Sequence, residues 1–258
     1  IHNPIIGRET LWQDNPKTKK LKKVTIIGGG PAGLEAARVA AKIGHHVTLF
    51  EQSNKLGGQF RIWSKAPLTA EFIKSINWYE AQLRKLQVNV RLNRKIEENE
   101  IEKFDTDVII MATGSKAFKE NLTDGNIKSE ILVLSPEDVF LKEQENKRIV
   151  LIDEGGGRNG ISAIDAILKN NLITIVSTDF LIGEMINPNL RTPIYKKFLA
   201  QGVKFIPCCK LARLLKNDVV IKNIYSNKEQ TIKNVDTIIN WRGNQIVNNL
   251  QAAIERQS

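Results

Sequence analysis

The sequence contains little cysteine and no long apolar run. Its 258 residues include 2 cysteines, the adjacent pair Cys208 and Cys209. One adjacent pair cannot form a disulfide framework and lacks the spacing of metal ligands, so both are interpreted as structural cysteines of a reducing compartment. No apolar stretch approaches the roughly 20 residues that a membrane-spanning helix requires, and the N-terminus lacks the charged-then-apolar order of a secretion signal. These absences predict a cytoplasmic protein without a membrane partner.

Acidic residues are outnumbered in this chain. It has 38 Lys and Arg against 28 Asp and Glu, which gives a formal net charge of +10. A basic excess can indicate nucleic-acid binding, because clustered cations bind phosphate backbones. Here most lysines are scattered, and the one dense run, "KTKKLKK" at residues 17–23, has no interleaved aromatic residues. We interpret this run as a solvated linker that can contact an acidic partner, and we expect no nucleic-acid binding.

Two stretches of the chain share the order strand, glycine turn, helix, strand. The first is "KVTIIGGGPAGLEAARVAAKIGHHVTLFE", residues 23–51, and the second is "RIVLIDEGGGRNGISAIDAILKNNLITIVST", residues 148–178. Apolar strands joined by a glycine turn and an amphipathic helix indicate βαβ units of a parallel sheet. When the first strands are aligned, the second turn is two residues longer. The added residues are Asp153 and Glu154.

Two further apolar strands follow these units and resemble each other, "DVIIMATG" at residues 107–114 and "DTIINWRG" at residues 236–243. A helix is expected at residues 70–86, a strand at 88–92, and an antiparallel strand pair within residues 216–234. The predicted fold class is α/β, with two nested Rossmann-like units, parallel sheets and an antiparallel strand excursion. The expected organisation is an extended arm at residues 1–22, a first domain at 23–116 plus 235–258, and an inserted domain at 117–234.

The first glycine turn carries the chemistry of a nucleotide site. In "GGGPAG", Gly28, Gly30 and Gly33 have the spacing of the dinucleotide-binding fingerprint. The first glycine permits a tight turn, the second lets a pyrophosphate approach the backbone, and the third lets helix and strand pack closely. The N–H groups and the positive dipole at the helix start then favour phosphate. Glu51, at the end of the second strand, is placed to accept hydrogen bonds from the adenosine ribose hydroxyls.

The segments that follow carry a resemblance to a known family. "LFEQSNKLGGQF" places Gly57 and Gly58 soon after Glu51, and "ATG" ends a later strand. This pattern resembles the FAD-binding half of the two-dinucleotide-domain flavoprotein oxidoreductases. The resemblance implies that the loop, the acid, the Gly-Gly pair and the ATG turn surround the adenine-dinucleotide part of FAD. No catalytic residue and no metal ligand is predicted, and the implied cofactor-binding residues are Gly28, Gly30, Pro31, Ala32, Gly33, Glu51, Gln52, Gly58, Gln59, Ala112, Thr113 and Gly114.

A narrower resemblance lies in the arm. "IHNPIIGRE" at residues 1–9, followed by the Lys-rich linker and the glycine loop, resembles long old-yellow-enzyme relatives, the trimethylamine dehydrogenase, N-demethylase and 2,4-dienoyl-CoA reductase group. In that group a TIM barrel carries FMN and the substrate site, and a cysteine cluster holds a [4Fe-4S] centre; this sequence contains neither. The resemblance implies a C-terminal module of a flavin-dependent oxidoreductase, whose partner is a flavin-bearing barrel domain or subunit. It implies FAD or ADP at the first loop, because the sequence stops before a Gly-Asp turn that lies near the flavin ribityl chain in the family.

The second glycine turn, residues 153–160, repeats the fingerprint where the family has its NAD(P)H domain. Asp153 and Glu154 bring negative charge toward a pyrophosphate, although Arg158 would offset it. The following strand ends at residues 177–179 without an arginine to receive a 2′-phosphate. The turn therefore favours lost or altered NAD(P)H binding, and with it the amine dehydrogenase and N-demethylase branch of the family.

Three functions stay open on the sequence. The first is the adenine-nucleotide module of a methylated-amine dehydrogenase or N-demethylase. The second is an NAD(P)H:flavin oxidoreductase that resembles 2,4-dienoyl-CoA reductase. The third, from another class, is a non-catalytic nucleotide-binding subunit that docks on a separate flavoprotein through the basic arm. An electron-transfer partner and a homo-oligomer are compatible with each of them.

Overall fold

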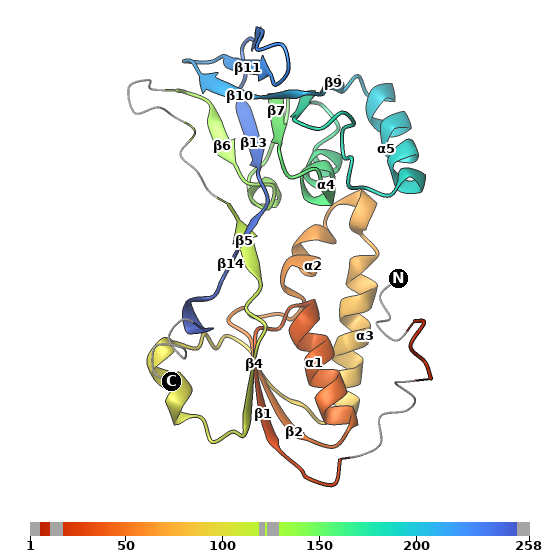
Figure 1. Ribbon diagram of the computed structural model, residues 1–258, viewed down its shortest axis with the longest axis vertical. Helices are drawn as coiled ribbons and strands as arrows, with labels where there is room; N and C mark the ends of the chain where they lie inside the picture. The colour runs from red at the N-terminus through yellow and green to blue at the C-terminus, as the bar shows by residue number, and fades with distance from the viewer. Residues whose placement is uncertain (1–5, 11–17, 119–121, 123–128, 252–258) are drawn as a thin grey trace. The chain divides into compact units, whose positions relative to one another are not determined.

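The computed structural model describes residues 6–10, 18–118, 122 and 129–251 (Figure 1). Residues 1–5 and 11–17 of the expected arm lie outside the described residues. The chain divides into two compact units, of which unit 1 comprises Ile1–Arg61, Glu71–Gly114 and Val247–Ser258, and unit 2 comprises Ile62–Ala70 and Ser115–Ile246. Each unit is built on its own parallel sheet, as the α/β fold class predicted.

Unit 1 contains a four-stranded parallel sheet in the order β3-β2-β1-β4. The apolar residues of β1 alternate between its two faces, so that Val24 and Ile26 pack on one side and Ile27 on the other. A strand that buries both faces must be covered on both, which is the usual state of a parallel sheet. The strands are β1 (Lys23–Ile27), β2 (His46–Phe50), β3 (Asn89–Arg91) and β4 (Val108–Met111).

Helices α1 (Pro31–Lys42) and α3 (Phe72–Lys85) cover one face of this sheet (Figure 1). Helix α1 begins with a proline, which is well suited to the first helical position, and its buried residues recur every three or four positions toward the sheet. The opposite face packs against the 3₁₀ helix η2 (Glu98–Lys103) through Ile101. The short helix α2 (Gly58–Trp63) begins in unit 1 and ends in unit 2.

Unit 2 contains a five-stranded parallel sheet in the order β6-β13-β7-β8-β9. Helix α4 contacts β7 and β13 of this sheet, where its Gly160 lies against Leu151. The elements are β6 (Leu132–Leu134), β7 (Arg148–Asp153), α4 (Arg158–Ala166), β8 (Leu172–Ser177), α5 (Pro188–Ala200), β9 (Lys204–Ile206) and β13 (Thr237–Trp241), with the 3₁₀ turns η1 (Pro67–Thr69) and η3 (Asp138–Phe140).

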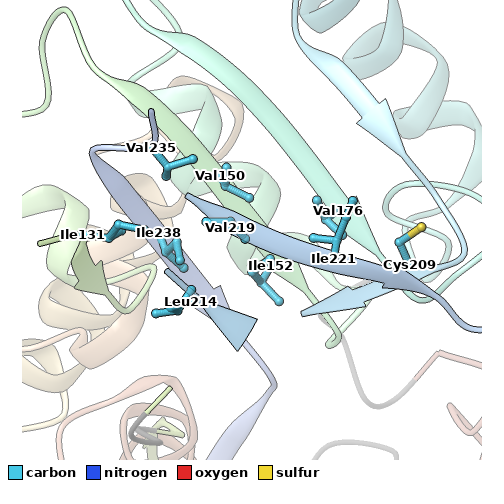
Figure 2. Close-up of a cluster of buried hydrophobic side chains, with 10 residues drawn as sticks. All are labelled: Ile131, Val150, Ile152, Val176, Cys209, Leu214, Val219, Ile221, Val235 and Ile238. Carbon is cyan, nitrogen blue, oxygen red and sulfur yellow. The ribbon is translucent and has the colours of Figure 1, made fainter. Parts of the chain in front are cut away.

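The other face of the unit 2 sheet is covered by an antiparallel sheet of β10 (Cys209–Leu214), β11 (Val219–Asn223) and β12 (Glu229–Ile232). Figure 2 shows the cluster between the two sheets, in which Val150 and Ile152 of β7 meet Val219 and Ile221 of β11. Cys209 belongs to this cluster, in agreement with a structural role, and both cysteines are free thiols. A two-stranded antiparallel sheet joins β5 (Ser115–Ala117) and β14 (Asn244–Ile246).

The sequence-based boundaries differ from the two units in three places, of which the smallest is residues 115–116, assigned to the first domain but lying in unit 2. Residues 235–246, which the sequence assigned to the first domain, lie in unit 2, because β13 pairs with β6 and β7. Residues 62–70, also assigned to the first domain, lie in unit 2 as well, where Leu68 N donates to Asp165 Oδ2 at 2.8 Å. The helix expected at residues 70–86 and the antiparallel pair expected within 216–234 are confirmed as α3 and as β11 with β12. The third antiparallel strand, β10, was not predicted.

Candidate nucleotide-binding site

The turn between β1 and α1 consists of Gly28, Gly29 and Gly30, and its glycines meet different needs. Gly28 has a φ of +110°, and a Cβ added there would lie 2.2 Å from the backbone oxygen of Ala112. A Cβ added at Gly33 would lie 1.9 Å from the backbone oxygen of Gly28. Both positions therefore require glycine for the fold itself. At Gly30, in contrast, an added Cβ would meet no atom within 4 Å.

The N-terminus of α1 lies at the open space beside Gly30. Gly30 is the N-cap residue, Pro31 follows it, and no side chain of the described residues makes an N-cap hydrogen bond there. Helix N-termini carry unsatisfied N–H groups and a partial positive charge, both of which favour phosphate. The arrangement fits a pyrophosphate at the second glycine, because the glycine at this position has no packing reason of its own.

Glu51 is the first residue after β2, and its carboxylate is hydrogen-bonded to the glycine turn. The residue is 7% exposed, and its Oε2 accepts from Gly29 N at 2.7 Å. Its Oε1 accepts from Ser53 N at 2.8 Å and from Ser53 Oγ at 2.5 Å. A carboxylate can accept about four hydrogen bonds, so three donors leave capacity for a ribose hydroxyl. Ser53 was not among the predicted site residues, although its position two residues after the acid is that of a local Ser turn.

The pair Gly57 and Gly58 also contacts the first glycine turn. Gly57 N donates to Gly29 O at 2.8 Å, and a Cβ added at Gly58 would lie 3.1 Å from Gly30 Cα. Gln59 follows in the first turn of α2 and is half-buried, whereas Gln52 is exposed. The fold thus brings the first loop, Glu51 and Gly58 together, as the sequence predicted for a common site.

The "ATG" turn after β4 divides between two roles. Ala112 lies against the glycine turn, since its backbone oxygen is the atom that a Cβ on Gly28 would strike. Thr113 Oγ1 instead donates to Val247 O at 2.5 Å, and Gly114 O accepts from Val247 N at 2.9 Å. Thr113 and Gly114 therefore hold the returning chain, while Ala112 and the backbone N of Thr113, which lies 3.2 Å from a Cβ added at Gly28, border the loop.

The second glycine turn agrees with its sequence-based interpretation in length but not in the placement of its acids. By strand register the turn is two residues longer, as expected, because Ile152 corresponds to Ile27 and α4 begins at Arg158 where α1 begins at Pro31; the first of the added residues, Asp153, also extends β7. Asp153 is 0% exposed, and its Oδ1 accepts from Gly156 N at 3.0 Å. Glu154 pairs with Arg242 at 3.1 Å, so Arg242 occupies the role considered for Arg158. The acids are thus held within the unit rather than directed at a ligand.

The strand registers show which residue of unit 2 corresponds to Glu51. Ile27 pairs with Phe50 in unit 1, and Ile152 pairs with Val176 in unit 2. Because Ile27 and Ile152 occupy the same place in the aligned strands, Ser177 corresponds to Glu51. Ser177 Oγ accepts from Asp179 N at 3.2 Å. The acid beside the second turn is instead Asp179, two residues later: a Cβ added at Gly156 would lie 2.6 Å from its Oδ2, as one added at Gly29 would lie 2.9 Å from Glu51 Oε2.

No other site type is evident in the described part of the chain. None of its helices combines the length and the apolar character needed to cross a membrane. The His, Cys, Asp and Glu residues of this described part form no group of three or more that could hold a metal ion.

Two βαβ units, each with a glycine turn between its first strand and its helix, define a dinucleotide-binding flavoprotein or pyridine-nucleotide fold. Residues 22–257 match the family described as pyridine nucleotide-disulphide oxidoreductase, and the chain belongs to this family. Its relatives include amine dehydrogenases, N-demethylases and an old-yellow-enzyme-type reductase/demethylase, as the resemblance predicted. The chain is a module of a flavin-dependent oxidoreductase, related to N-methyl amine dehydrogenases.

The chain is shorter than the proteins to which it is similar. It is 29% identical to N,N-dimethylglycine/sarcosine dehydrogenase of Chromohalobacter salexigens, over 100% of this chain and 39% of that protein. It is 32% identical to NADH oxidase of Thermoanaerobacter brockii, over 78% of this chain and 31% of that protein. The solved 6-hydroxypseudooxynicotine amine oxidase of Pseudomonas geniculata N1 shares the fold with a TM-score of 0.88 at 21% identity, over 99% of this chain and 40% of that one.

Proposed function

We propose that unit 1 binds the adenine nucleotide part of FAD, or ADP. The pyrophosphate lies at the turn of Gly28, Gly30 and Gly33 and at the start of α1, and the ribose hydroxyls bind the Glu51 carboxylate. The observation that carries this proposal is the contact between Glu51 Oε2 and Gly29 N, which ties the ribose acceptor to the phosphate turn. Gly58, which approaches Gly30, and Ala112, which borders Gly28, complete the surroundings.

The remaining predicted residues have smaller parts in this proposal. Pro31 fixes the first turn of α1, and Ala32 keeps the helix start free of a bulky side chain. Gln52 and Gln59 border the site from the exposed turn after Glu51 and from α2. Thr113 and Gly114 act indirectly, by holding the segment that contains Val247 against the end of β4.

For the whole protein we propose the oxidation of a methylated amine by a flavin-dependent enzyme. Support comes from the similarity to a dimethylglycine/sarcosine dehydrogenase over the full chain. The flavin supplies electron-accepting chemistry, and the residues of this chain bind and orient the adenine nucleotide. FMN, the [4Fe-4S] centre and the substrate site belong to the barrel partner. The second candidate is an NAD(P)H-consuming flavoprotein reductase, which the similarity to an NADH oxidase favours.

Replacing Glu51 with glutamine tests the nucleotide site directly. The variant keeps an acceptor near Gly29 N but loses the charge that strengthens the hydrogen bonds to ribose. Hydrogen bonds to charged groups contribute roughly 1.5–3 kcal/mol, so we expect the Kd for ADP to rise about 10- to 100-fold in isothermal titration calorimetry. Glu102→Gln, an exposed acid of η2, is the matched control and should leave the Kd unchanged. An unchanged Kd for Glu51→Gln, or no ADP binding by the wild-type chain, would refute the proposal.

A further inference from the structure

The middle glycine of each glycine turn lies beside an acid. A Cβ added at Gly29 would lie 2.9 Å from Glu51 Oε2, and one added at Gly156 would lie 2.6 Å from Asp179 Oδ2. By strand register, the residue that corresponds to Glu51 is Ser177, so the acid of unit 2 comes two residues later. The turn of unit 2 is also two residues longer than that of unit 1. The two changes compensate each other, so that the acid and the middle glycine lie at similar distances in both units.

The backbone oxygen of each middle glycine also has an equivalent partner. Gly29 O accepts from Gly57 N at 2.8 Å, and Gly156 O accepts from Met185 N at 3.1 Å. Gly57 and Met185 each stand six residues after the acid of their unit. The segment that follows the acid therefore returns to the glycine turn in the same way in both units.

The glycine that corresponds to Gly30 is equally accessible. Gly157 is the N-cap residue of α4, a helix of 9 residues, and no side chain of the described residues caps it. A Cβ added at Gly157 would meet one atom within 4 Å, Gly155 O at 3.6 Å, which belongs to the turn itself. The start of α4 thus offers unsatisfied N–H groups and the positive end of a helix dipole to a phosphate, as the start of α1 does.

Two buried polar atoms at the second turn have no hydrogen-bond partner among the described residues. Trp241 is 6% exposed, and its Nε1 would lie 2.3 Å from a Cβ added at Gly155. Asp153 is 0% exposed, and its Oδ2 is the second of these atoms. Buried polar groups are almost always hydrogen-bonded to protein, water or a ligand. A phosphate oxygen at the turn, or a water bound with it, would supply the acceptor that the indole N–H lacks.

The Asp179 carboxylate is available to a ribose and unfavourable to a phosphate. Gly156 N donates to Asp153 Oδ1 at 3.0 Å, and no described residue donates to the Asp179 carboxylate. Glu184 is close enough to act on Asp179 electrostatically, so two acids share this place. A carboxylate accepts hydrogen bonds from the 2′- and 3′-hydroxyls of a ribose, whereas a 2′-phosphate would bring a third negative group to the two acids.

Exposed aromatic rings follow the acid directly. Phe180 and Tyr225 are 66% and 63% exposed, and their rings stack with centroids 5.6 Å apart. Cys208 joins their segments, because its N donates to Asp179 O at 3.0 Å and its O accepts from Ile224 N at 2.9 Å. An adenine ring, which is attached to the ribose, can stack on such an aromatic surface.

We propose that unit 2 contains a second dinucleotide site, in which Asp179 is the ribose acceptor and selects a pyridine dinucleotide with a free 2′-hydroxyl, NADH or NAD⁺, over NADPH. The pyrophosphate lies at Gly157 and the start of α4. The sequence indicated lost or altered NAD(P)H binding at this turn, and the proposal commits to altered binding, with the acid moved by two residues. It goes beyond the nucleotide site proposed for unit 1. Combined with the second candidate function, it implies a reductase specific for NADH.

The first test locates the bound dinucleotide by hydrogen–deuterium exchange of the wild-type chain. We expect NADH, titrated to millimolar concentration, to slow exchange in peptides that cover residues 153–160 and 177–186. Half-maximal protection by NADPH should require a concentration at least about tenfold higher. No protection of these peptides by NADH, or a smaller ratio between the two dinucleotides, would overturn the proposal. Peptides that cover residues 26–35 report on unit 1 in the same experiment, so a failure of the nucleotide proposal for unit 1 is recognised separately.

The second test removes the charge of Asp179. Asp179→Asn keeps the size of the side chain, and we expect it to raise the NADH concentration for half-maximal protection at least about tenfold. Glu145→Gln removes an exposed acid that precedes β7, and as the matched control it should bind NADH like the wild type. Equal NADH binding by a folded Asp179→Asn variant and the wild type would show that Asp179 is not the ribose acceptor. If the variant fails to fold, the preference of the wild type for NADH over NADPH decides.

Discussion

Replacing Gly30 with valine is expected to abolish ADP binding by unit 1 without lowering the stability of the free protein. Gly30 has φ −75° and ψ 179°, an extended conformation that valine readily adopts, and no atom lies within 4 Å of an added Cβ. The new side chain occupies the space through which the pyrophosphate approaches the turn. We expect at least a 100-fold rise in the Kd for ADP, a loss of about 3 kcal/mol in binding free energy.

A matched substitution separates binding from folding at the same turn. Gly33→Ala places a Cβ 1.9 Å from the backbone oxygen of Gly28, which cannot move without disturbing β1 and α1. We expect this variant to lose several kcal/mol of unfolding free energy, as for other overpacked sites. Thermal unfolding of the free proteins and calorimetric titration with ADP measure the two properties. Tight ADP binding by Gly30→Val, or a loss of stability equal to that of Gly33→Ala, would contradict the assignment of roles.

The first loop could be predicted from the sequence because its parts are local. Gly28 and Gly30 lie in the turn, Gly33 lies in the first turn of α1, and Glu51 directly follows the next strand, so the βαβ unit brings them together without further information. The hydrogen bonds of Ser53 to Glu51 depend on side-chain rotamers, which the spacing of residues does not determine. The same limit applies to Thr113, whose hydroxyl donates to Val247, a residue far along the chain.

The boundary expected near residue 235 differs from the division into two units because two strands carry similar patterns. The strand at residues 237–241 has the apolar run and the following glycine that are typical of an exit strand, and the pattern does not state which sheet receives it. The contact between Trp241 and Gly155 could not be predicted from the sequence either, because it joins segments that meet only through strand pairing. Strand β10 was missed because a register shift between Leu211 and Arg213 breaks the alternation on which strand prediction depends.

The buried acid of the second turn has a measurable consequence for stability. The pKa of the Asp153 carboxyl is raised from 3.8 to about 7, mainly by burial and also by the nearby Asp179, whereas backbone hydrogen bonds from Gly156 and Gly155 act in the opposite direction. Burial also raises the pKa of Asp179, and the negative charge of Glu184 adds to this effect. In the folded protein, Asp153 is thus ionised only at neutral to alkaline pH, in a place where Oδ2 has no partner among the described groups.

The sign of the pH dependence follows from this shift. A carboxyl that binds its proton more tightly in the folded state stabilises the fold at low pH, and this contribution is lost as the pH rises from about 4 through about 7. A difference of about three pKa units corresponds to about 4 kcal/mol at alkaline pH, taken as an upper estimate. Asn has the same shape as the protonated acid and cannot ionise, so Asp153→Asn should remove most of this loss.

We therefore expect Asp153→Asn to match the wild type near pH 4 and to be more stable above pH 8, by as much as about 4 kcal/mol. The free energy of local opening is measured by hydrogen–deuterium exchange of peptides from β7 and β8, because the two units need not unfold together. Glu154→Gln is the matched control. It removes a neighbouring carboxylate that pairs with Arg242, whereas the Asp153 carboxyl is fully buried. A stability difference between Asp153→Asn and the wild type that stays constant from pH 5 to pH 9 would show that Asp153 does not titrate in this range. If the difference appears and grows with pH, the acid that makes the second turn unusual in sequence is also the group that makes unit 2 sensitive to pH.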